Sequence, residues 1–314
     1  MVKRLVNRLT VALGFDWLRL GLGLGLGIGL GLGLGIGLAT PLLGQTNPDQ
    51  LPNSAHYFSL NQAGSRPDSE TNAPAKPPGL DWPANADAAR ILSSFLGLSF
   101  RVDGVINDQG AYSSWAKPNQ TFRAAGFNCS GFIVSLARFI WNENLTLADT
   151  RRDRLHDSNA ASPLGLDWDF GLDVALNIAE KRFIRYLPEP TTPPHSFNDA
   201  QQPVGWGVNI NSPAFLTVLR ELMAERIYIF VISKPDRRFL GKLSYYHTGF
   251  VLVDPQGAIW LYHATARAGV HRINLAQTAS LATFRRYYPP VKNGERRILF
   301  LELALPSQTR LNGQ

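Results

Sequence analysis

The chain's only cysteine lies in the stretch Phe127-Asn128-Cys129-Ser130-Gly131-Phe132-Ile133. A glycine-containing turn, Ala125-Gly126, precedes this stretch, and the apolar run Phe132–Trp141 follows it. The large apolar residues of that run recur at helical spacing and form a wide stripe, which predicts a buried helix over Ser130–Asn142. Cys129 is therefore expected at the start of a core helix.

The residues before this stretch predict one further helix and a long loop. Ala84–Leu98 carries apolar residues at helical spacing, and Gly97 marks its expected end. Residues 100–126 are expected to form loops. Their aromatic residues, Tyr112 and Trp115, either line a cleft or simply pack the loop.

The residues after the cysteine helix predict an insertion followed by a sheet. Residues 143–212 are expected to be irregular apart from a short helix over Leu172–Phe183, and Ser212-Pro213 predicts another helix start with Ser212 as the N-cap. The expected strands are Ile227–Ser233, which is central, then Tyr245–Val253, Ala258–His263 and Arg297–Leu303. The turn composition of residues 254–257 joins the second and third strands into a hairpin. This order predicts an α+β fold, an N-terminal helical part packed on an antiparallel sheet, in one domain of residues 84–306.

Two histidines are expected to meet the cysteine at one edge of that sheet. His247 begins one strand of the predicted hairpin and His263 ends the other, so a tight turn brings them together. A helix start lowers the pKa of a thiol, and a neighbouring imidazole completes a thiolate–imidazolium pair that a third polar group orients. The backbone N–H groups of Cys129 or Ser130 are candidates to stabilise an oxyanion. His271 is a further candidate, but Ala268-Gly269-Val270 places it beyond the strand end.

Two other uses of these residues stay open. Cys129 is either this nucleophile or a buried, inert cysteine. A zinc site would draw on Cys129, His247 and His263, but closely spaced ligand pairs are missing. Because those ligand pairs are missing, we expect no metal. The chain also has no dinucleotide fingerprint or phosphate-binding loop, so we expect no cofactor.

The N-terminus has the composition of an export segment. Basic residues at positions 3, 4 and 8 precede an apolar Gly/Leu/Ile run over residues 20–38, and Gly37-Leu38-Ala39 supplies small residues before a cleavage position. Residues 1–39 are therefore a signal peptide or an uncleaved membrane anchor, since residues 20–38 are long enough to span a bilayer. Residues 40–83 have the composition of a flexible linker, and 307–314 form a tail. The expected location is the periplasm or cell envelope. Disulfides are common there, but a chain with a single cysteine cannot form an internal one.

The net charge narrows the choice of partners. Of the formal charge of +7, residues 1–39 contribute +3 and the remainder +4. A mildly basic surface suits an anionic cell wall or membrane. No Lys/Arg cluster is interleaved with aromatic residues, so nucleic acid is not an expected partner. The oligomeric state stays open.

Three blocks of the sequence resemble a known family. Residues 127–133 resemble the nucleophile motif of the NlpC-type cell-wall cysteine peptidases, whose pattern is aspartate-cysteine-serine-glycine-phenylalanine. The block His247-Thr-Gly-Phe-Val is similar to the family's histidine strand. The block His263-Ala-Thr, with Gly269-Val270 after it, resembles the family's histidine-alanine-serine segment. The blocks keep the family's order and cover about 127–142 and 227–275.

The resemblance implies a papain-like fold and an endopeptidase that hydrolyses amide bonds in peptidoglycan stem peptides. It implies Cys129 as nucleophile, His247 as general base, His263 as the orienting residue and Tyr112 as the aromatic residue upstream of the cysteine. N-acetylmuramoyl-L-alanine amidase-like branches of the superfamily fit about as well, and an inactive wall-binding member is the non-enzymatic alternative. The chain departs from the family in Asn128, which replaces the aspartate, and in a long insertion at about 143–226, which would form a lid or reshape the cleft.

Overall fold

The computed structural model describes residues 87–141, 144–154, 170–190, 206–235, 243–291 and 294–305. The expected export segment, linker and C-terminal tail lie outside these residues, so the predictions made for them are unaffected. Among the helices that the structure describes, none combines the length and the apolar character needed to cross a bilayer.

The described residues form an α+β fold, as the order of the predicted elements indicated. The first elements are α2 (Ala88–Ser94), β1 (Ser99–Phe100), β2 (Gly104–Ile106), β3 (Tyr112–Ser114), β4 (Gly126–Phe127), α3 (Cys129–Trp141), α4 (Leu147–Thr150) and α5 (Phe170–Ala179). The later elements are β5 (Phe183–Leu187), β6 (Val208–Asn209), α6 (Ala214–Arg220), β7 (Arg226–Pro235), β8 (Leu243–Val253), β9 (Ile259–Thr265), β10 (Gly269–Asn274), α7 (Thr278–Tyr287) and β11 (Arg297–Ala304).

The main sheet is antiparallel throughout and has the strand order β10-β9-β8-β7-β11-β5, with β6 paired to β11. The predicted central strand is confirmed as β7, between β8 and β11. The predicted hairpin is confirmed as β8 and β9, joined by a turn in which Gly257 N–H donates to Asp254 O at 2.9 Å.

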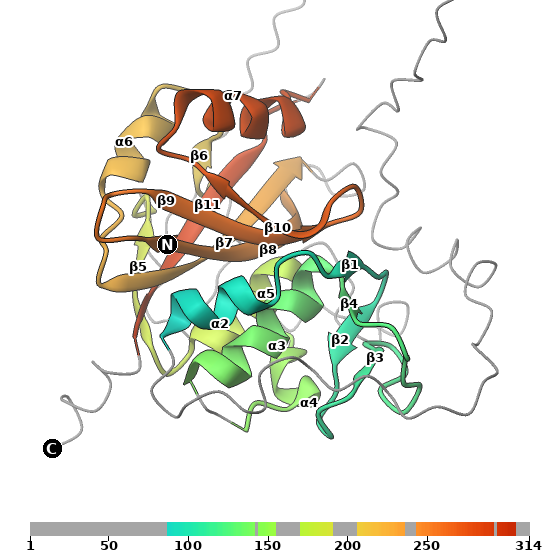
Figure 1. The fold of residues 1–314 in the computed structure, drawn as a ribbon. Coiled ribbons are helices and arrows are strands. Elements are labelled where there is room, and N and C mark those ends of the chain that lie inside the picture. Colours follow the sequence, from blue (N-terminus) through green and yellow to red (C-terminus); the bar gives the residue numbers. More distant parts are fainter. Residues whose placement is uncertain are drawn as a thin grey trace, which may run out of the picture. The chain divides into compact units, whose positions relative to one another are not determined.

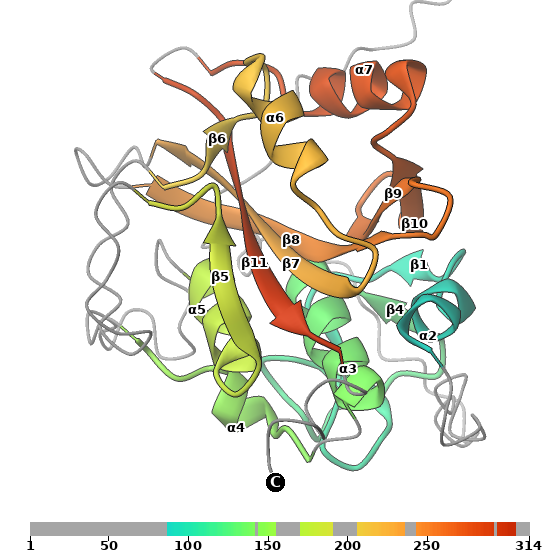
Figure 2. The same ribbon diagram turned by 90° about the vertical axis from the view of Figure 1, so that its left-hand side faces the viewer.

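Helices cover both faces of this sheet: α2, α3 and α5 lie on one side, and α6 and α7 on the other (Figures 1 and 2). Residues of β7 therefore point alternately into two apolar clusters. Ile227, Ile229 and Val231 join the cluster under α3 and α5, while the residues between them join the cluster under α6 and α7. Burial on both faces explains why β7 is apolar without alternation.

The insertion predicted at 143–226 belongs in part to the core. Helix α5 is buried from Gly171 to Ala179, and β5 extends the sheet by pairing with β11. The predicted short helix is confirmed as α5, although it ends at Ala179 and not at Phe183. The expectation of otherwise irregular structure is wrong for the residues of α4, β5 and β6. Residues 100–126 likewise hold short strands where loops were expected, because β2 and β3 form a hairpin and β4 pairs with β1.

Helix α6 lies where Ser212-Pro213 predicted it, but Ser212 is not its cap. The Ser212 hydroxyl donates instead to the carbonyl of Asn209 at 2.8 Å, and the helix begins after Pro213 without a side-chain cap. Here the hydroxyl stabilises the preceding turn.

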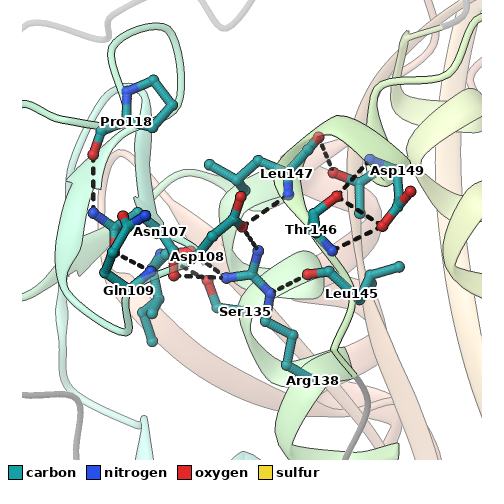
Figure 3. Close-up of polar contacts among 12 residues, drawn as sticks. Asn107, Asp108, Gln109, Pro118, Ser135, Arg138, Leu145, Thr146, Leu147 and Asp149 are labelled. Carbon is teal, nitrogen blue, oxygen red and sulfur yellow. Dashed lines mark hydrogen bonds and ion pairs between the residues drawn. The ribbon is translucent and has the colours of Figure 1, made fainter.

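Arg138 ties α3 to the segments on either side of it (Figure 3). Its guanidinium donates to the carbonyls of Ile106 at 2.6 Å, Asn107 at 3.0 Å and Leu145 at 2.5 Å. It also pairs with the Asp108 carboxylate at 2.5 Å. One side chain thus satisfies backbone groups on both sides of the cysteine helix.

Arg138→Met is expected to lower the free energy of unfolding by about 2–4 kcal/mol, because three part-buried carbonyls lose their donor. Urea unfolding followed by circular dichroism measures this change. Arg152→Ala is the matched control: it removes an exposed ion pair to Glu180 and should cost less than about 1 kcal/mol. Equal losses in the two variants would contradict the role given to Arg138.

Candidate active site

Cys129 is the first residue of α3, and Asn128 caps that helix. The Asn128 side-chain oxygen accepts from the Gly131 N–H at 2.6 Å, which is the bond that an N-cap residue makes to the third helical residue. The Asn128 N–H donates in turn to the carbonyl of Gly104 at 3.2 Å. An amide oxygen therefore does here what a carboxylate oxygen would do, without adding a charge next to the cysteine.

Gly131 allows the first turn of α3 to touch the backbone of β2. A Cβ on Gly131 would lie 1.9 Å from the Gly104 carbonyl oxygen, a distance that no side chain tolerates. The glycine of the cysteine stretch is thus required by this close approach, which also sets the depth at which Cys129 lies.

Asn128→Ala is expected to destabilise the protein by about 1 kcal/mol, since the Gly131 N–H loses its acceptor. Asn128→Asp keeps an acceptor, and its negative charge is favourable at a helix N-terminus, so stability should be retained or rise. Urea unfolding of the two variants checks this, and a loss in Asn128→Asp equal to that in Asn128→Ala would contradict the cap.

The sulfur of Cys129 lies against strand β8 on both sides of His247. Cys129 is half-buried as a residue, and its thiol faces the carbonyl of Tyr246 with a distance of 4.0 Å between Sγ and O. The backbone N–H groups of Thr248 and Ser130 and the Ser130 hydroxyl also face the sulfur. Ser130 is therefore next to the sulfur, as its place in the sequence suggested.

A β-bulge in β8 produces this arrangement. His247 lies opposite Ile232 and Tyr245 lies opposite Ser233, so Tyr246 is an extra residue without a counterpart in β7. Bulges of this kind redirect side chains and backbone groups locally. The bulge leaves the Tyr246 carbonyl beside the cysteine and His247 immediately after it.

Three imidazoles form a hydrogen-bonded row across β8, β9 and β10. His247 Nε2 lies 2.8 Å from His263 Nδ1, and His263 Nε2 lies 2.9 Å from His271 Nε2. The row ends at His271 Nδ1, which lies 3.0 Å from the carbonyl oxygen of Gly269. The structure thus brings His247 and His263 together, and it adds a third histidine.

The expectation that His271 lies beyond the strand end is wrong. Residues 266–268 form a short turn, so β10 begins at Gly269 and His271 pairs directly with His263. The signal was present in the spacing: a hairpin centred on Arg267 places residues 263 and 271 opposite each other.

Two aromatic residues that no motif indicated pack on these rings. Phe230 of β7 has its ring centroid 5.8 Å from that of His247 and 6.2 Å from that of His263. Tyr288, which follows α7, lies 5.8 Å from His247. Burial raises the pKa of the Tyr288 phenol well above its usual value. The electrostatic effects of the nearby Tyr246 and Cys129 raise it further. Tyr288 therefore forms part of the wall of the candidate site.

Burial keeps all three histidines neutral. It lowers the pKa of His247 to about 3, and repulsion between the protonated forms of His247 and His271 makes a smaller contribution. Burial, followed by repulsion from His247 and His271, lowers the pKa of His263 well below 6.5. The pKa of His271 is also lowered by burial, against an opposing effect of the Gly269 carbonyl.

Burial likewise raises the pKa of the Cys129 thiol, and the N–H groups that face the sulfur only partly oppose this. In the free protein, the Cys129 thiol and the His247 imidazole therefore both favour their neutral forms. This differs from the expected thiolate–imidazolium pair, because loss of hydration at the sulfur outweighs the favourable effect of the helix start.

Tyr112 lies in the core. It belongs to β3, is fully buried, and packs its ring 5.4 Å from that of Phe127. Burial raises the pKa of its phenol, and the hydroxyl has no hydrogen-bond partner among the described residues. Trp115 is buried as well, against Phe170. Of the two alternatives for these aromatic residues, packing is the one that their contacts support.

The ring nitrogens of the histidine row are hydrogen-bonded to one another, and this leaves few lone pairs that could bind a metal. Across the described ranges, no group of three or more His, Cys, Asp or Glu side chains has an arrangement that could hold a metal ion. His56, His156 and His195 lie outside those ranges.

Comparison with known proteins adds no family assignment. No protein-family model, no curated protein and no solved structure matches this chain. Interpretation of the site therefore rests on its residues and their geometry.

The neutral histidines predict a loss of stability in acid. Below pH 6.5 the unfolded chain binds protons that the buried imidazoles do not, so stability falls as the pH falls. Each such histidine should contribute about 1.4 kcal/mol per pH unit. Urea unfolding at a series of pH values measures the slope, and His263→Gln should make it shallower. An unchanged slope would show that His263 is not held neutral.

Proposed function

We propose that this chain is an exported cysteine hydrolase with a papain-like fold that cleaves an amide bond in peptidoglycan stem peptides. One observation carries the proposal. The sulfur of Cys129, at the start of α3, lies against the backbone on both sides of His247, whose ring is hydrogen-bonded to His263. A thiol, a base and a group that orients the base are the parts that nucleophilic catalysis requires.

The reaction begins from the neutral pair. As the sulfur attacks the carbonyl carbon of the amide, its proton passes to His247 Nδ1, and the carbonyl oxygen becomes an oxyanion. The N–H groups of Cys129 and Ser130, at the helix start, are the donors suited to that oxyanion. The amide C–N bond then breaks as His247 gives its proton to the leaving amine, and a thioester remains on the sulfur. Water attacks the thioester carbonyl, the C–S bond breaks, and a carboxylic acid and the free thiol are formed.

His263 acts on this reaction through His247. Its Nδ1 faces His247 Nε2 at 2.8 Å, so it holds the imidazole plane while the charge on that ring changes. Phe230 and Tyr288 restrict the same ring by packing. The proposed roles are therefore Cys129 as nucleophile, His247 as general base and His263 as orienting residue.

The choice of substrate rests on the sequence. The three blocks resemble the cell-wall peptidases, and the N-terminal segment has the composition of an export signal. Peptidoglycan is the polymer outside the cytoplasm that contains short peptides of this kind.

The test is digestion of purified peptidoglycan by the full chain, with Cys129→Ala as the matched inactive control and mass spectrometry of the fragments. The wild-type chain should release fragments that the variant does not. Shortened peptides left on the glycan identify an endopeptidase, whereas intact stem peptides released from the glycan identify an amidase. Identical fragment patterns from the two chains would overturn the hydrolase proposal. Sedimentation with the polymer without cleavage would instead support an inactive wall-binding protein.

A further inference from the structure

The histidine row continues one residue past the catalytic set proposed above. His271 comes from β10 and sits directly opposite His263 in the β9–β10 pair. Their rings are 4.3 Å apart between centroids, and the two Nε2 atoms are 2.9 Å apart. Two imidazole nitrogens at this distance need one proton between them, because two lone pairs or two N–H groups would repel each other.

The carbonyl of Gly269 decides where that proton lies. A carbonyl oxygen only accepts, so the nitrogen that faces it, His271 Nδ1, must carry a hydrogen. A neutral imidazole carries one N–H, and burial lowers the pKa of all three rings, so they are neutral. His271 Nε2 is consequently an acceptor.

The same rule then fixes the other two rings in turn. His263 Nε2 must donate to His271 Nε2, which leaves His263 Nδ1 as an acceptor. His247 Nε2 must therefore donate to His263 Nδ1, which leaves the lone pair of His247 on Nδ1. This nitrogen is the one that the proposed function needs as its base.

The carbonyl at the end of the row is itself held in place. Gly269 has a φ of +65°, which favours glycine, and a Cβ there would lie 2.2 Å from the Leu98 carbonyl oxygen. The next residue, Val270, is bonded in both directions to the segment after α2: its N–H donates to Leu98 O at 2.8 Å, and its carbonyl accepts from Gly97 N–H at 2.9 Å. The start of β10 is thus fixed by backbone contacts that do not involve the imidazoles.

We propose that His271 is a positioning residue that, through His263, sets the tautomer of His247 and so keeps the basic lone pair on Nδ1. It touches neither the sulfur nor the substrate. Its catalytic consequence rests on the proposed function, but the tautomers themselves do not. When His247 accepts the cysteine proton it still donates through Nε2, so the row needs no rearrangement during the reaction.

The direct test is proton–nitrogen correlation spectroscopy of the full chain labelled with ¹⁵N-histidine, with signals assigned from single His→Gln variants. In the wild-type chain, His247 and His263 should carry hydrogen on Nε2, and His271 should carry it on Nδ1. A wild-type His271 with hydrogen on Nε2, or a wild-type His247 with hydrogen on Nδ1, would overturn the proposal.

Two variants of His271 separate positioning from packing. His271→Gln offers an amide oxygen as acceptor to His263 Nε2, so it should keep the wild-type tautomers of His247 and His263. His271→Leu fills the space without an acceptor, so His247 should become a mixture of tautomers. On peptidoglycan fragments, His271→Leu should lower kcat by at least about tenfold with little change in KM, and His271→Gln should restore most of it.

The outcomes also distinguish this inference from the proposed function. A His271→Leu chain in which His247 keeps the Nε2–H tautomer would overturn the role of His271, whether or not peptidoglycan is cleaved. The expected tautomers in a wild-type chain that cleaves nothing would support the positioning role and count against the hydrolase proposal alone.

Discussion

The site depends on the close approach of the first turn of α3 to the backbone of β2. Gly131 leaves no room for a side chain against the Gly104 carbonyl, and Asn128 bonds both to Gly131 and to Gly104. These contacts hold the start of the helix at one depth and one orientation. Cys129 is thereby placed against β8 at the bulge that precedes His247. A helix shifted by the width of one methyl group would move the sulfur away from that strand.

The second constraint is that the histidines form a row in which His247 and His263 are buried and His271 is half-buried. Burial makes each imidazole neutral, and neutral imidazoles can be linked only if each gives one hydrogen and accepts one. The row therefore has a direction, which the Gly269 carbonyl sets at the His271 end. Phe230 packs on the rings of His247 and His263, and Tyr288 packs on that of His247, which shields these two buried rings from water. In this row, packing and hydrogen bonding orient the imidazoles, whereas in Ser-His-Asp triads an aspartate does so by its charge.

The sequence was sufficient for the parts of this structure that local patterns determine. The apolar stripe after Cys129, the unbroken apolar run of β7 and the turn at 254–257 predicted α3, the central strand and the hairpin. Those elements carry Cys129, His247 and His263. Local sequence patterns gave wrong predictions where tertiary contacts determine the structure. Ser212 bonds backward instead of capping α6, and the partner of β5 is a strand more than a hundred residues away. Tyr112 carries no sign in its neighbours that it faces the core, and the thiol pKa depends on burial that no motif records.

The central claim is that His247 acts as the base for Cys129, and the rate of Cys129 alkylation by iodoacetamide across pH tests it most directly. The thiol is the only one in the chain, so the reaction reports on this site alone. If His247 is the base, the wild-type chain should react at neutral pH at least about tenfold faster than a folded His247→Gln variant, because only the wild-type ring removes the thiol proton. The two rates should converge at alkaline pH, where the thiol ionises unaided. Equal rates at every pH would contradict the pairing of Cys129 with His247.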